Sequence, residues 1–153
     1  MAERDETPSE RADRNFAELV QELRVAQTGV QILFAFLLTL AFYSSFPHDD
    51  ETFAYVLTAA LVAAACSALC FMAPVAAHRI TFRLGGKEQL VWVTHRFAVA
   101  GLALLSVAMM LAIWMVIAFL FNDGVAGMTV SGLAVLVVAV WVVLPLALRS
   151  KIT

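Results

Sequence analysis

The chain has 153 residues, of which 62% are hydrophobic and only 14% are charged. A soluble domain is usually only about half apolar, so this composition excludes an ordinary soluble domain and indicates an integral membrane protein. The formal net charge of −2 says little about partners, because charge in a membrane protein is interpreted loop by loop.

The first fourteen residues, "MAERDETPSERADR", are polar, mixed in charge and contain no apolar core. Such a segment cannot bury enough apolar surface to fold alone, and it lacks the apolar region of a secretory signal peptide. We therefore expect a disordered cytoplasmic tail over residues 1–14, a single membrane domain over 15–149, and a second short cytoplasmic tail over 150–153.

Residues 15–26 are predicted to form an amphipathic helix that leads into the first membrane span. At 100° per residue, Gln21, Arg24, Thr28 and Gln31 fall within an arc of about 80°, opposite a face of leucine, valine and phenylalanine. We call the following residues the polar face of the first helix: Glu18, Gln21, Glu22, Arg24, Thr28 and Gln31. Polar groups are costly against lipid, so this face is expected to dock the helix against other helices. A polar, water-lined entry is the alternative.

Four apolar runs are long enough to cross a membrane, which takes about 20 residues of helix. They cover residues 27–46, 53–77, 97–121 and 125–148. The first is followed by "PHDDET", the second by the basic segment "HRITFRLGGKEQ", and the third by the turn-like "NDGVAG". The predicted fold class is therefore all-α, a polytopic membrane protein with four transmembrane helices.

All ten lysine and arginine residues lie before the first span, between the second and third, or after the fourth. The other two connections carry only acidic charges, from Asp49, Asp50, Glu51 and Asp123. By the positive-inside rule, both termini are predicted to be cytoplasmic in the plasma membrane.

Small residues in the second and third spans are typical of close helix packing in membranes. The predicted packing faces are Ala59, Ala63 and Ser67 in the second span, and Gly101, Leu105, Ala108 and Ala112 in the third. These faces predict helix contacts and no particular chemistry.

Histidine–arginine pairs stand at the ends of the second and third spans that adjoin the basic segment: His78 with Arg79, and His95 with Arg96. Paired histidines can bind haem iron, but the neighbouring arginines and the position at the headgroup level favour contact with anionic lipid. We therefore predict lipid contacts for these four residues.

No catalytic motif, phosphate-binding loop or metal motif is present in the sequence, and the basic residues are explained by topology rather than by nucleic acid. We expect no enzymatic activity, no cofactor and no metal site. Cys66 and Cys70 share one helix face inside a span, which does not predict a disulfide framework.

A cation:proton antiporter normally needs an ionisable group inside the membrane. The second, third and fourth spans carry none, and the first carries Gln31.

Three segments, "ELRVAQTGVQILFAFLLTLAF", "APVAAHRITFR" and "THRFAVAGLALL", carry a resemblance to a known family. The chain resembles a family of small bacterial membrane proteins of unknown function, mainly actinobacterial, some of which are labelled sodium:proton antiporter by automated transfer. The likeness covers residues 16–148 and implies these characteristic positions: Glu22, Arg24, Gln27, Thr28, Gln31, His78 and Arg79.

The expected function is that of a non-enzymatic membrane protein that acts through helix contacts, either with itself or with a membrane partner. The alternative is a small ion-coupled transporter of the cation:proton antiporter type. The polar face of the first helix distinguishes the two, because a transporter needs water there and an interaction protein needs a partner there.

Overall fold

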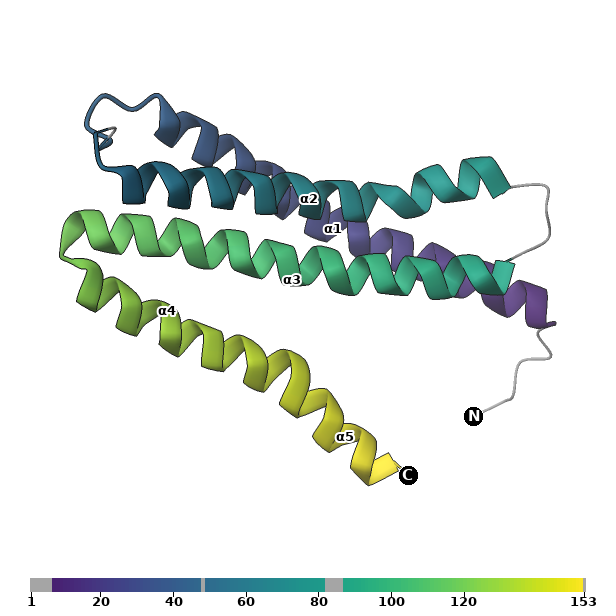
Figure 1. Ribbon diagram of the computed structural model, residues 1–153. Coiled ribbons are helices and arrows are strands. Elements are labelled where there is room, and N and C mark those ends of the chain that lie inside the picture. Colours follow the sequence, from purple (N-terminus) through teal and green to yellow (C-terminus); the bar gives the residue numbers. More distant parts are fainter. Residues whose placement is uncertain (1–6, 48, 82–86, 153) are drawn as a thin grey trace. The chain divides into compact units, whose positions relative to one another are not determined.

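The computed structural model describes residues 7–47, 49–81 and 87–152, and all of its regular structure in these ranges is helical. In chain order the helices are α1 (Pro8–Ala41), α2 (Glu51–Thr81), α3 (Lys87–Leu120), α4 (Asp123–Val138), η1 (Ala139–Val143) and α5 (Leu144–Ile152). Figure 1 labels the five α-helices. Four helical stretches are long and apolar enough to cross a membrane: Asp13–Ala41, Glu51–Ile80, Leu90–Leu120 and Asp123–Ser150. These stretches support a multi-pass membrane protein.

The first helix begins at Pro8, earlier than the predicted start at residue 15. The backbone N–H of Glu10 donates to the Thr7 hydroxyl (3.3 Å), and the backbone N–H of Thr7 donates to the Glu10 carboxylate (2.9 Å). This reciprocal pair is a capping box, with proline at the first helical position. Residues 1–6 of the predicted tail lie outside the described residues. α1 then continues as one helix through Gly29.

The first helix also ends earlier than predicted, at Ala41 instead of residue 46. Phe42 and Tyr43 donate their backbone N–H groups three residues back, to Thr39 and Leu40, which tightens the chain into turns. Pro47 disfavours helical geometry at Phe46, the residue before it. The prediction was wrong at this end because aromatic residues in the turn are as apolar as those in a span.

Two units are distinguished by contacts along the chain: Met1–Phe36 with Ala63–Leu105, and Leu37–Val62 with Ser106–Thr153. In the first, the side chains of Leu23 and Val30 from α1, Phe71 from α2 and Ala98 from α3 form a buried apolar cluster. The Ser67 hydroxyl of α2 donates to the backbone carbonyl of Gly101 in α3 (2.7 Å).

In the second unit, aromatic rings gather where α1 ends and α2 begins. Phe46 and Phe53 meet edge to face with ring centroids 6.0 Å apart, and Phe53 lies 5.8 Å from Trp114 of α3. Asp50 accepts the backbone N–H of Thr52 (2.8 Å) at the start of α2, and Asn122 accepts that of Val125 (3.0 Å) at the start of α4.

The fourth predicted span, residues 125–148, is interrupted by the π-helical turn η1. Pro145 follows this turn, and a proline in a helix has no N–H and its ring clashes with the carbonyl four residues earlier. The backbone N–H of Leu144 bonds to the carbonyl of Ala139, five residues back, so the wider turn accommodates the proline without ending the helix.

Candidate functional site

The polar face of α1 is exposed along its whole length. Leu23 and Val30, on the opposite side of the helix, are 6% and 1% exposed and pack in the apolar cluster with Phe71. The exposed residues are all six that the sequence selected: Glu18, Gln21, Glu22, Arg24, Thr28 and Gln31. The first helix is therefore packed within this chain by its apolar side, and its polar side is available to other molecules.

The hydrogen bonds of this face stay within α1. Arg14 and Glu18 form an exposed ion pair one turn apart (3.3 Å), and the Thr28 hydroxyl donates to the backbone carbonyl of Arg24 (3.1 Å). Among the residues that the structure describes, the side chains of Arg24 and Gln31 make no hydrogen bond or ion pair. Both side chains thus retain donors for a group outside this chain.

An apolar strip, formed by Val25 and Ile32, lies at the edge of the arc that holds Arg24, Thr28 and Gln31, on the same exposed side of α1. Val25 is 72% exposed and Ile32 is 68% exposed. Ile32 follows Gln31 directly in the sequence, so an amide and an aliphatic side chain stand at the same level on neighbouring parts of one surface. Contact with lipid is favourable for the Ile32 side chain but leaves the Gln31 amide without hydrogen-bond partners.

The level of Gln31 along the helices follows from its neighbour Val30. Val30 belongs to the same cluster as Phe71, which precedes Arg79 in α2 by eight residues. At a helical rise of about 1.5 Å per residue, Phe71 lies about 12 Å along the axis from Arg79. The Gln31 amide is thus at the level of apolar packing and not at the basic end of the helices.

The predicted histidine–arginine residues are in two different settings. His78 is half-buried, and its ring stacks on that of Phe16 with centroids 5.0 Å apart, so α1 and α2 meet at this point. Arg96 lies over the ring of Trp92, one turn earlier in α3, at 4.8 Å from the guanidinium carbon to the ring centroid. Arg79 and His95 are exposed.

Sequence reasoning missed these two ring contacts. The Trp92–Arg96 pair has the four-residue spacing of helical neighbours, which was a usable signal. The Phe16–His78 contact joins segments that are far apart in the sequence, so no local sequence pattern predicts it.

The hydroxyl of Thr94 is buried and has no hydrogen-bond partner among the described residues. No group of three His, Cys, Asp or Glu residues in the described ranges could hold a metal ion.

The four helical stretches that are long and apolar enough to cross a membrane, together with the buried apolar cluster, fit a multi-pass helical membrane protein. Residues 5–145 match the model of a family described as Family of unknown function (DUF6328), and the chain belongs to that family. No curated protein matches the chain, and no solved structure matches it.

Proposed function

We propose that this protein is a non-enzymatic membrane protein that acts through contacts of the polar face of α1 with a second copy of the chain or with another membrane protein. One observation carries the proposal: the chain packs α1 by Leu23 and Val30 and leaves Arg24, Thr28 and Gln31 exposed. A helix that has already used its apolar side for folding has its polar side available for recognition.

The energetic argument concerns the Gln31 amide, which stands at the level of apolar packing. An amide without hydrogen-bond partners in hydrocarbon costs on the order of 1–3 kcal/mol by mutational measures. A hydrogen bond between helices in a membrane contributes about 0.6–2 kcal/mol. A partner helix over this face therefore both removes the cost and adds the bond, whereas lipid does neither.

The proposal includes an orientation and a location. Arg14 lies near the start of α1, Arg79 near the end of α2 and Arg96 in the first third of α3. Asp49 and Asp50 lie between α1 and α2, and Glu51 begins α2. By the positive-inside rule we expect both termini in the cytoplasm, and the location we propose is the plasma membrane. The exposed Arg79 and Arg96 are positioned for anionic lipid headgroups.

Thiol labelling tests whether water or a dry contact covers the polar face. In a Cys66→Ala, Cys70→Ala background, Gln31→Cys is treated in native membranes with a membrane-impermeant maleimide. Arg11→Cys, at an exposed position of α1 outside the polar face, is the reactive control. The proposal expects rapid labelling at position 11 and protection at position 31.

Rapid labelling of Gln31→Cys would contradict the proposal and would favour the alternative, an ion-coupled transporter with a hydrated path along this face. Glu18 and Glu22, both exposed on α1, would then be the acids to test for proton coupling. Cation-dependent proton movement in proteoliposomes, reduced by Glu22→Gln, would establish that alternative.

A further inference from the structure

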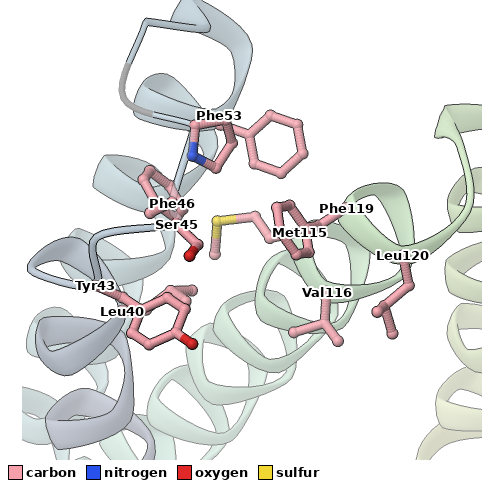
Figure 2. A pocket seen from close by; sticks show the side chains of 10 residues that line it. Leu40, Tyr43, Ser45, Phe46, Phe53, Met115, Val116, Phe119 and Leu120 are labelled. Atoms are coloured by element: carbon pink, nitrogen blue, oxygen red, sulfur yellow. The ribbon is translucent and has the colours of Figure 1, made fainter.

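An apolar cavity lies in the second unit, near the turn between α1 and α2 that carries Asp49 and Asp50. Its volume is about 130 Å³, and it is lined from the end of α1, the following turn, the start of α2 and the last turns of α3. Figure 2 shows the side chains of Tyr43, Ser45 and Phe46 on one side of it and those of Met115 and Phe119 on the other.

The walls of this cavity select an apolar occupant. Phe46 and Phe53 are at most 9% exposed and Met115 is 1% exposed, so these three side chains form the buried part of the wall. The other part of the wall comes from exposed apolar side chains, among them Tyr43 and Phe119. An apolar cavity of about 150 Å³ stays dry and holds one benzene-sized molecule. The volume here therefore fits one aromatic ring or a short branched alkyl group.

A second, open hollow adjoins the cavity and shares two of its lining residues, Phe46 and Pro47. Its other walls come from Ser44, Asp49, Asp50 and Glu51. All three carboxylates are exposed, and among the described residues none of them has an ion-pair partner. Residue 48, in the same turn, lies outside the described residues. We call Asp49, Asp50 and Glu51, which line the hollow beside the apolar cavity, its acidic rim.

We propose that this cavity and its acidic rim form a binding site for a lipophilic cation, a molecule with one apolar group and one cationic head. The apolar group occupies the cavity, and the head lies against Asp49, Asp50 and Glu51, where the exposed aromatic ring of Tyr43 adds a cation–π surface. Charge complementarity excludes anions, and a neutral molecule gains only the apolar part.

The residues of this site are different from those of the polar face of α1, so a failure of one proposal leaves the other untouched.

Trp114 serves as the fluorescent reporter, because its ring centroid lies 5.8 Å from that of Phe53, which lines the cavity. The protein is prepared as a Trp92→Phe, Trp141→Phe variant in uncharged maltoside micelles, which leaves Trp114 as its one tryptophan. Benzyltrimethylammonium is titrated while Trp114 fluorescence is followed, with benzyl alcohol as the neutral probe carrying the same ring.

The expected result is a saturable fluorescence change with benzyltrimethylammonium. The triple variant Asp49→Asn, Asp50→Asn, Glu51→Gln should bind the cation about three- to tenfold more weakly at low salt, with its affinity for benzyl alcohol unchanged. Low salt is used because exposed charges are screened as the salt concentration rises. Asparagine at position 50 preserves the cap of α2. Val116→Phe, which fills the cavity from its wall, should abolish binding of both probes.

Equal affinity for both probes, unchanged by the triple substitution, would overturn the proposal and leave a plain apolar site of the kind that a lipid chain fills. No saturable response to either probe would also overturn it. Retained binding of the cation in Val116→Phe would separate the acidic rim from the cavity and contradict the proposed site.

Discussion

At the scale of single residues, Gly101 is where the backbone of α3 meets both Ser67 and Phe71 of α2. The Ser67 hydroxyl donates to the Gly101 carbonyl, and a Cβ atom at position 101 would collide with the ring of Phe71. That ring is 1% exposed and cannot move into open space.

Gly101→Ala is therefore expected to destabilise the protein by about 1–3 kcal/mol, the usual cost of overpacking a fitted core. Unfolding by a denaturing detergent, followed by circular dichroism, measures the change. Gly29→Ala is the matched control, because nothing lies within 4 Å of its added methyl group. Equal stability of the two variants would refute the close approach, and Phe71→Leu should restore part of the loss in Gly101→Ala.

Residue patterns predicted the buried seam of α3 better than that of α2. Gly101, Ala108 and Ala112 are buried as expected, and Leu105 is half-buried. In α2, Ala63 and Ser67 are buried as expected, and the prediction was wrong at Ala59, which is exposed. A row of buried positions along α2 alternates by three and four residues: Leu57, Ala60, Ala64, Ser67, Phe71 and Pro74. A strict repeat of four drifts around a helix by about 40° per step, and alternating spacing keeps one side toward its partners.

At the scale of elements, the capping box of α1 depends on the ionised Glu10 side chain. Hydrogen bonds from the backbone N–H and the hydroxyl of Thr7 lower the pKa of this carboxyl group below its usual value. A lowered folded-state pKa means that the carboxylate contributes its stability above the ordinary pKa of glutamate and loses it as the pH falls through the lowered value.

The first turn of α1 is thus expected to fray on acidification, with faster amide hydrogen exchange over residues 10–13. Thr7→Ala should fray the turn at neutral pH and reduce the response to acid. Exchange over these residues that is the same in the variant and independent of pH would contradict the capping box. The sequence "TPSE" is typical of a capping box, but the surrounding polar residues led to the prediction of a disordered tail at this place.

Pro145 is expected to be the cause of the π-helical turn in the fourth span. Pro145→Ala restores the N–H and removes the ring clash, so the Leu144 N–H should bond four residues back, and the helix after it should rotate by about 100°, one residue of helical turn. Spin-label distances from Arg149→Cys to a fixed site on α4, in a cysteine-free background, measure this rotation. Unchanged distances would mean that other packing holds η1 open.

At the scale of the whole molecule, we expect the placement of basic residues to set the topology. Reporter fusions after Thr153 and within the turn at Asp49 are expected to lie on opposite sides of the membrane, with the C-terminal fusion in the cytoplasm. Fusions on the same side would contradict four spans. An exposed reporter at the C-terminus on the outer surface would reverse the orientation and place the acidic rim inside.

Hydropathy sufficed to predict four helices long enough to span a membrane, because nearly uncharged apolar runs of that length are typical of membrane spans and rare in soluble domains. It did not predict which side of α1 packs within the chain. The sequence expectation assigned docking to Gln31 and its neighbours, whereas Leu23 and Val30 pack within the chain. In a membrane, both the polar and the apolar side of a helix can make helix contacts, and only the three-dimensional structure shows which side packs within the chain.

The apolar cavity also could not be predicted from the sequence, because its walls come from three helices and a turn.

The most direct test of the account is photo-crosslinking around α1 in native membranes. A photo-activatable residue is placed singly at Arg24, Thr28 and Gln31 on the polar face, and at Val25 and Ile32 on the neighbouring apolar strip. If the polar face contacts a protein, the polar positions should give a discrete crosslinked protein band, either a dimer of this chain or one defined partner. The apolar strip should give weak or lipid-only products. Lipid-only products from all five positions would contradict the claim that the polar face of α1 is a protein contact.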